Sequence, residues 1–215
     1  RQVVEESQRL LTRVADLRAG TSRSLDVDVD LGAGRRLTGT VSGIHGNKIV
    51  SLGYSRLKAR QRLMSWVDLL ALSAGHPDES WTAHAVGRDR AGPLRALAGP
   101  LDHRAAGWLR DLVELRDLGL TRPLPAPLLT AHAWAETHAR ELRGDDRSPE
   151  HAAAREWVTD PNNRFGITGE DADAHHVRVY GPRAPLQALL DAGLATYAWR
   201  IWEPLVTGAE RVGPL

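Results

Sequence analysis

The fold is decided by residues 25–54, which read LDVDVDLGAGRRLTGTVSGIHGNKIVSLGY. From Leu25 to Leu31 apolar and acidic residues alternate strictly, which is the period of a β-strand with one solvated face. Glycine-containing turns follow at 32–34 and 45–47. The pattern predicts a meander of three strands, namely Leu25–Leu31, Leu37–Ile44 and Lys48–Tyr54.

The first of these strands carries three aspartates on one face, Asp26, Asp28 and Asp30. Oxygen anions are the ligands of hard divalent cations, so the three could bind a metal ion. Charged residues on one strand face more commonly face solvent, and we favour that interpretation.

Helices dominate the rest of the chain. We expect an amphipathic helix over 3–18, a long buried helix from Leu57 to Ala74 capped by Ser55, and a fourth strand over 80–86. Further helices are predicted at 103–118, 127–143, 149–158 and 185–202, with a turn-rich stretch at 160–181. The fold class is α/β (α+β), with a small mixed sheet that is concentrated before residue 90 and flanked by several helices.

One domain is expected over residues 1–215, with an N-terminal helix (1–24), a strand-rich core (25–90) and a helical remainder (91–215). A length of 215 residues and an apolar fraction of 42% allow a real core. The chain begins at Arg1 and its sole methionine is Met64, so we interpret it as part of a longer polypeptide. It has no cysteine and no apolar run of membrane-spanning length, which favours a cytoplasmic protein without a membrane partner.

Charge is distributed unevenly although the net charge is only +1. No Asp or Glu occurs between Asp30 and Asp68. A segment without carboxylates cannot hold a divalent cation, but it can attract a polyanion. The same segment contains seven basic residues, which are our candidate DNA contacts: Arg35, Arg36, Lys48, Arg56, Lys58, Arg60 and Arg62.

The second and third predicted strands, followed by a basic helix, resemble the core of the PD-(D/E)xK restriction-endonuclease-like fold. In that fold two carboxylates hold a metal ion that activates water, and a lysine assists at the phosphate. Aligned with that pattern, this chain has Ser42 and Ser51 at the acid positions and Gly53 at the lysine position. The resemblance therefore implies a nuclease-like core without catalytic residues.

A closer resemblance is to the C-terminal domain of RecC, the gamma subunit of exodeoxyribonuclease V. It is carried by five short segments in the family's order, spanning roughly residues 37–202: Leu37–Gly39, Gln61–Leu70, Ala126–Leu129, Gly169–Asp173 and Arg200–Trp202. The resemblance implies a non-catalytic scaffold of a helicase-nuclease for double-strand break repair and recombination. It also implies RecB-like and RecD-like partner subunits, duplex and forked DNA, the remainder of its own chain, and no cofactor.

Among the basic residues, those at the start of the long helix are the strongest candidates. A helix N-terminus disfavours cations by a few tenths of a kcal/mol each, and a docked phosphate would reverse that sign. The alternative is a solvated face on which arginine stems cover apolar surface. Residues 169–176, GEDADAHH, could hold a metal ion, but we favour an acidic loop or a protein contact. Trp199 and Trp202 share a helix face that is either core or a partner contact.

Two other functions are compatible with the sequence. One is an active metal-dependent nuclease with relocated carboxylates, drawn from Asp26, Asp28 or the 170–173 cluster. The other is a protein-interaction module without a DNA role. DNA affinity that does not fall as salt concentration rises would favour the protein-interaction module over a domain that contacts the DNA phosphate backbone.

Overall fold

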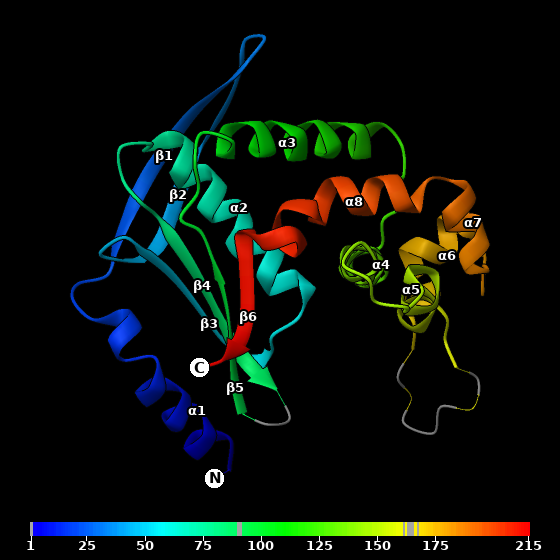
Figure 1. The fold of residues 1–215 in the computed structure, drawn as a ribbon, viewed down its shortest axis with the longest axis horizontal. Coiled ribbons are helices and arrows are strands. Elements are labelled where there is room, and N and C mark those ends of the chain that lie inside the picture. Colours follow the sequence, from blue (N-terminus) through cyan, green and yellow to red (C-terminus); the bar gives the residue numbers. More distant parts are fainter. Residues whose placement is uncertain (1, 90–91, 161, 163–165, 167) are drawn as a thin grey trace. The chain divides into compact units, whose positions relative to one another are not determined.

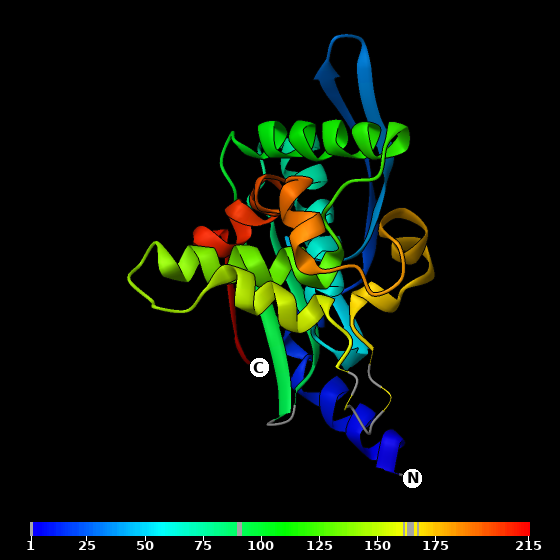
Figure 2. The ribbon, with the colours of Figure 1, turned by 90° about the vertical axis from the view of Figure 1, so that its right-hand side faces the viewer.

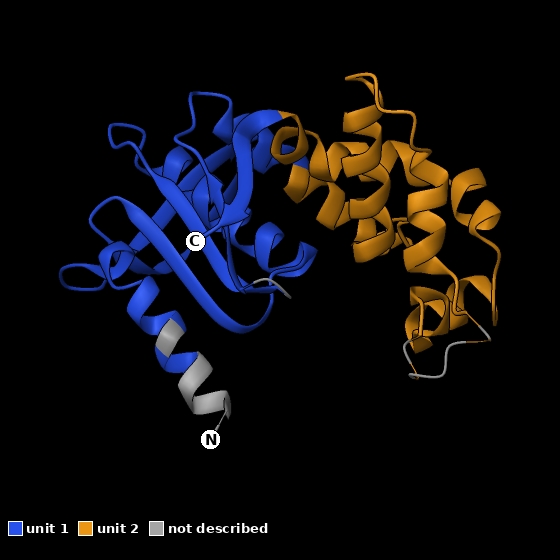
Figure 3. Cartoon of the chain, turned by 60° about the horizontal axis from the view of Figure 1, so that its bottom comes forward, with its two compact units in different colours: residues 1–111, 208–215 blue, residues 112–207 orange. Residues whose placement is uncertain are grey.

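The computed structural model describes residues 2–89, 92–160, 162, 166 and 168–215. It forms two compact units, one of residues 1–111 and 208–215 and the other of residues 112–207 (Figure 3). Each is described separately as unit 1 and unit 2. The prediction of a single domain over 1–215 stays a prediction. Among the described residues, no helix combines the length and apolarity needed to cross a membrane.

Unit 1 is built around a six-stranded mixed sheet with strand order β1-β2-β3-β4-β5-β6 (Figure 1). All neighbouring pairs are antiparallel except β3 and β4, which are parallel. This confirms the α/β class and the predicted meander. The strands are β1 (Arg23–Gly32), β2 (Arg35–His45), β3 (Lys48–Arg56), β4 (Thr82–Asp89), β5 (Gly92–Ala98) and β6 (Glu210–Pro214).

The alternation predicted for β1 is present in the structure. Val27, Val29 and Leu31 are buried, whereas Asp26, Asp28 and Asp30 are exposed. Asp26 accepts a hydrogen bond from Thr40, Asp28 is ion-paired with Arg36, and Asp30 accepts the backbone N–H of Gly32. The solvated-face interpretation is therefore correct. These carboxylates stabilise the hairpin instead of converging on a cation.

Register identifies the sheet face that lies under α2 (Ala59–Gly75). Ile49, Ala83, Ala98 and Glu210 are cross-strand neighbours in one row over β3 to β6. Glu210 is bonded to Arg62 of α2, so the whole row points toward that helix. The next row, Val50, His84, Leu97 and Arg211, points to the opposite face.

The opposite face is partly covered by α1 (Gln2–Arg13) and the short 3₁₀ turn η1 (Asp16–Arg18). Leu10 and Val14 form a buried cluster with Val86 of β4. Leu17, Leu52 and Leu215 pack against that cluster. Burying a side chain of this size contributes about 1.5–3 kcal/mol, so the apolar stripe predicted over 3–18 fixes the helix to the sheet.

One sequence prediction for unit 1 is wrong, and two strands were not predicted. Ser55 does not cap the long helix, because β3 continues to Arg56 and the helix begins at Ala59 after the cap residue Lys58. Four strands of the sheet precede residue 90, but β5 and β6, which were not predicted, follow it. β5 forms backbone hydrogen bonds with β4, and β6 forms them with β5. Neither strand has a strong period-2 sequence pattern of its own.

Unit 2 is helical over its described residues. Its first helix, α3, begins within unit 1. The predicted helices at 103–118, 127–143 and 149–158 are confirmed with small shifts. The helices are α3 (Ala105–Thr121), α4 (Leu128–Glu141), α5 (Pro149–Trp157), α6 (Ala174–Tyr180), α7 (Leu186–Asp191) and α8 (Leu194–Pro204), with 3₁₀ turn η2 (Glu170–Ala172) and π-helical η3 (Leu205–Ala209).

Two predictions here are also wrong. The expected final helix over 185–202 is divided into α7 and α8, because Gly193 has φ 104°, a left-handed conformation that interrupts the helix. The stretch 160–181 contains α6, which was predicted to be turns. Residues 161, 163–165 and 167 of that stretch lie outside the described residues.

The core of unit 2 joins α4 to α8. Trp202 is buried with its ring 4.6 Å from that of His132, and Trp199 is half-buried with its ring 5.0 Å from that of His138. Both tryptophans therefore pack on α4. Of the two interpretations of their shared face, core packing is the one the structure supports.

Candidate nucleic-acid interface

The β3–α2 connection, residues 56–60, brings three of the predicted cations together. Leu57 donates its backbone N–H to the carbonyl of Arg88 on β4 (3.1 Å), which fixes the connection to the sheet. Lys58 donates its N–H to Oε1 of Gln61 (3.2 Å), a capping interaction that starts α2. Ala59 is buried. Arg56, Lys58 and Arg60 therefore alternate with anchored positions, and all three are exposed.

These three side chains keep their charges available. Within the described part of the chain, no ion pair joins Arg56, Lys58 or Arg60 to a carboxylate. The first turn of α2 has no acidic residue, so the partial positive charge of the helix N-terminus adds to the three cations. The arrangement favours an anion over any internal partner.

Two residues beside this connection were not among the sequence candidates. Arg88 pairs in register with Arg56, and its guanidinium lies 4.0 Å from the centroid of the Tyr54 ring. Its Nη1 also donates to the Tyr54 hydroxyl (2.9 Å). A stacked arginine on an aromatic ring is a rigid positive group. Arg88 lies far from Arg56 in sequence, so only the parallel pairing of β3 and β4 relates the two residues.

Arg62 was predicted to contact DNA, but the structure places it elsewhere. Its Nε donates to Oε2 of Glu210 (2.8 Å), and the two side chains are only 10% and 3% exposed. Position 62 is on the sheet-facing side of α2 because it lies two residues from the exposed Arg60. We therefore remove Arg62 from the set of candidate contacts.

Arg35 and Arg36 lie at the base of the β1–β2 turn. Figures 1 and 2 show this hairpin projecting away from the rest of the sheet, with its tip and the start of α2 at opposite ends of unit 1. Arg36 forms an exposed ion pair with Asp28, in which Nε donates to Oδ1 (2.9 Å). That contact lowers the pKa of Asp28 through the hydrogen bond from Arg36. The two arginines are thus a separate group from the helix start.

Lys48 is in a third place, the exposed β2–β3 turn. It is paired in register with His45 and with Thr82 of β4. This position is at the start of β3, whereas Arg56 is at its end. The structure therefore divides the seven sequence candidates among three surfaces and one buried ion pair.

The positions aligned with nuclease catalytic residues do not converge. The Ser42 hydroxyl accepts a hydrogen bond from Ser24 (2.9 Å), on the face of the hairpin that carries Asp26. Ser51 pairs with Ala85 and points toward the α2 side, whereas Gly53 lies in the irregular part of β3 between Leu52 and Arg56 and has no side chain. Gly43 has a left-handed backbone conformation (φ 74°) and lies between Ser42 and the residues of β2 that pair with β3. This irregularity interrupts the alternation of side chains along β2, so residues before and after Gly43 do not follow one alternating pattern.

The acidic segment 169–176 belongs to unit 2, where its carboxylates hold helix ends. Glu170 accepts the backbone N–H groups of Leu129 (3.0 Å) and Thr130 (2.8 Å) and the Thr130 hydroxyl (2.8 Å). Asp171 is buried and accepts from the N–H (3.0 Å) and hydroxyl of Thr159. Asp173 caps α6 through the N–H of His175 (2.8 Å), which lowers the pKa of Asp173.

These contacts use the oxygens that a metal ion would need. Across the described ranges, no cluster of three or more His, Asp or Glu side chains is arranged to hold a metal ion. The acidic-loop interpretation is the one consistent with this geometry.

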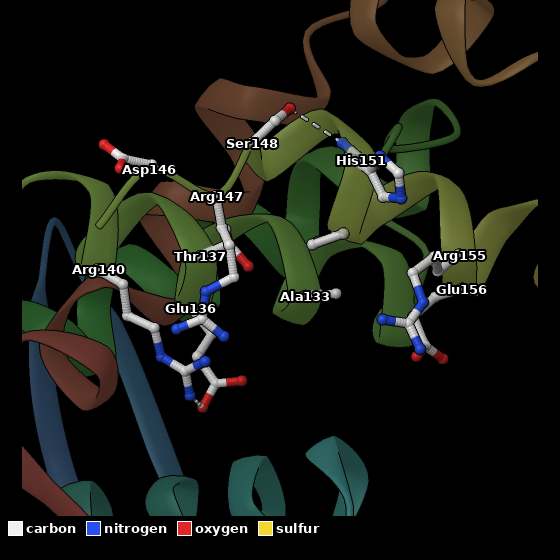
Figure 4. A pocket seen from close by; sticks show the side chains of 11 residues that line it. Ala133, Glu136, Thr137, Arg140, Asp146, Arg147, Ser148, His151, Arg155 and Glu156 are labelled. Atoms are coloured by element: carbon white, nitrogen blue, oxygen red, sulfur yellow. Dashed lines mark hydrogen bonds and ion pairs between the residues drawn. The ribbon is translucent and has the colours of Figure 1, made fainter.

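A pocket of about 660 Å³ lies between α4 and α5 of unit 2 (Figure 4). Its floor includes the buried Thr137. Arg140 and Glu136 on one wall are ion-paired at 3.2 Å. The charged lining is balanced between three arginines and three carboxylates, so the pocket does not select for a polyanion. The lining charges are Arg140, Arg147, Arg155, Glu136, Asp146 and Glu156.

Comparison with known proteins gives a consistent assignment. The family model of the RecC C-terminal domain matches residues 1–139. The chain is 40% identical over 204 residues to the RecBCD enzyme subunit RecC of Mycolicibacterium smegmatis, covering 88% of this chain and 18% of that protein. It is 37% identical over 231 residues to the RecBCD enzyme subunit RecC of Mycobacterium tuberculosis H37Rv, covering 97% of this chain and 20% of that protein. The chain thus spans about a fifth of the length of these relatives. It belongs to the RecC C-terminal domain family.

Proposed function

We propose that this chain is a non-catalytic, DNA-guiding domain of a RecC subunit in a helicase-nuclease, exodeoxyribonuclease V. The complex would process double-strand breaks for repair and recombination in the cytoplasm, with RecB-like and RecD-like partners. Family membership supports the subunit assignment, since the relatives are RecC subunits of RecBCD enzymes.

The observation that carries the DNA role is the exposed cation group at the β3–α2 connection. Arg56, Lys58 and Arg60 are exposed at a helix N-terminus that offers them no acidic partner. A DNA phosphate there would accept charge-assisted hydrogen bonds and relieve the repulsion between the cations. Such contacts orient a duplex without reading its sequence, which suits a protein that must act on any DNA end.

Arg35 and Arg36 on the projecting hairpin are a second proposed contact. The Arg36–Asp28 pair is exposed, so exchanging Asp28 for a phosphate costs little. Two contact groups at opposite ends of unit 1 could hold separate parts of a forked substrate.

The proposed lack of catalysis follows from the carboxylates. Phosphodiester cleavage by this kind of fold requires acids that hold a metal ion beside the scissile phosphate. Ser42, Ser51 and Gly53 offer none, and the side chains of Ser42 and Ser51 lie on opposite faces of the sheet. The alternative nuclease with relocated acids has weaker support. Asp26 and Asp28 bond within the hairpin, and Glu170 and Asp171 bond to backbone in unit 2.

The test uses a labelled forked DNA with the purified chain, in the presence of Mg²⁺ or Mn²⁺. We expect binding that weakens as salt concentration rises and no cleavage products. Metal-dependent cleavage that persists through purification controls would overturn the non-catalytic assignment. DNA affinity that does not change with salt would instead favour a protein-interaction module, because backbone contacts release counterions.

A further inference from the structure

The sheet face opposite α2 has an uneven charge distribution. On its β1–β2 half lie Asp26, Asp28 and Asp30. On its β3–β6 half, the rows defined by register contain no carboxylate. The basic residues and the histidine in these rows are Lys48, His84, Arg88, Arg95 and Arg211.

Register places three of these cations around His84. His84 on β4 pairs with Leu97 on β5, which pairs with Arg211 on β6. Arg211 is therefore two strands away from His84 in the same row. Lys48 on β3 pairs with Thr82, two residues before His84 on β4. Arg95 on β5 pairs with Val86, two residues after His84. With strands about 4.8 Å apart and a rise of about 3.3 Å per residue, each cation lies roughly 8–10 Å from His84 along the sheet.

His84 is a buried group within reach of two of these charges. Burial, and after it the charges of Arg95 and Lys48, lower its pKa to about 4. The side chain is 6% exposed, and its Nδ1 has no hydrogen-bond partner among the described residues. Within the same part of the chain, no ion pair neutralises Lys48, Arg95 or Arg211.

We propose that Lys48, Arg95 and Arg211 form a binding surface, the basic sheet face, for the phosphate backbone of duplex DNA. The proposal rests on the DNA-guiding function above and adds a surface distinct from the β3–α2 connection. A polyanion is the occupant that charge complementarity selects, since no ion pair joins the three cations to a carboxylate among the described residues, and a phosphate backbone removes their mutual repulsion. The carboxylates on the elements that cover part of this face are Glu5 and Glu6 of α1 and Asp16 of η1.

The spacing suits a DNA strand. From Lys48 on β3 to Arg211 on β6 the sheet spans three strand separations, about 14 Å. Successive phosphates of one strand are separated by the helical twist as well as by the axial rise of about 3.4 Å, so this width spans about three phosphates. Long Lys and Arg side chains can reach successive phosphates over that distance without base contacts.

The experiment measures duplex binding by fluorescence anisotropy, with a blunt labelled duplex of about 25 base pairs as the probe, over a range of salt concentrations. The variant is K48Q/R95Q/R211Q. The matched control is R155Q/R178Q/R183Q, which removes the same net charge from exposed positions of unit 2. We expect the variant to bind at least about tenfold more weakly at 0.1 M salt, with a salt slope lower by about 2–3, and the control to resemble the unmodified chain.

A second readout follows the His84 ring by NMR in the unmodified chain. Bound phosphates should raise the His84 pKa, because they offset the charges of Arg95 and Lys48. A variant that binds like the control, with an unchanged His84 pKa in the DNA complex, would overturn the basic sheet face while leaving the proposed DNA function intact. Failure of the unmodified chain to bind any DNA would overturn both.

Discussion

The basic connection at residues 56–60 and the acidic segment at 169–176 are both dense in charge, yet they treat that charge differently. In the acidic segment, Glu170 and Asp171 each accept several hydrogen bonds from their own unit. At the basic connection, backbone groups make the internal bonds and the three cationic side chains are exposed. A cluster of like charges thus indicates a binding site only where the fold does not already use those charges.

The largest expected effect separates Arg62 from its neighbours. Arg62→Ala leaves Glu210 as a buried carboxylate without its ion-pair partner, so we expect a loss of about 3–5 kcal/mol in the free energy of unfolding. The measurement is urea unfolding followed by tryptophan fluorescence. Arg60→Ala is the matched control, because this exposed cation at a helix start should change stability by less than about 0.5 kcal/mol. Equal effects of the two substitutions would contradict the buried ion pair.

A smaller effect is expected for Glu170→Gln in the acidic segment. The amide keeps the shape of the side chain but removes its charge, and it replaces one of the two accepting oxygens by an NH2 donor, so at least one of the three hydrogen bonds at the start of α4 is lost. We expect a loss of about 1–2 kcal/mol in unfolding free energy and no change in DNA affinity. Glu156→Gln, at an exposed position of α5, is the control. Weaker DNA binding by Glu170→Gln without loss of stability would show that the segment has a role outside folding.

The basic connection should give the opposite result. Replacing Arg56, Lys58 and Arg60 together by Ala should leave unfolding free energy nearly unchanged and weaken forked-DNA binding about tenfold at 0.1 M salt, with a salt slope lower by about 2–3. The loss should be equal across DNA sequences, because phosphate contacts carry no sequence information. An unchanged salt slope would count against this site.

Local patterns were sufficient for much of the fold. Strict alternation predicted β1 and its solvated aspartates, and helical periodicity placed α2, α3, α4 and α5 within a few residues. The strands that were not predicted depend on contacts between distant residues, because β5 and β6 form by pairing with β4 and with each other. The division of α7 from α8 is local, since Gly193 adopts the left-handed conformation that ends a helix.

The candidate site was less accessible from sequence. Exposure of Arg56, Lys58 and Arg60 agrees with the expected helix start. The burial of Arg62 depends on Glu210, which is 148 residues away. Arg95 and Arg211 gave no local signal, since only sheet register relates them to Lys48. The Gly43 bulge likewise turned Ser42 away from Ser51, although simple counting along the strands had aligned them.

The position of β6 has a consequence for how the protein is made. Unit 1 begins the chain, but its sixth strand and the carboxylate that pairs with Arg62 come only after residues 112–207. A ribosome must therefore synthesise all of unit 2 before the sheet of unit 1 can close. Until then β5 is an exposed strand edge and the Arg62 guanidinium has no Glu210. During that interval β5 is open to pairing with another strand. A stop codon at positions 208–210 would remove β6 from unit 1 and leave unit 2 whole.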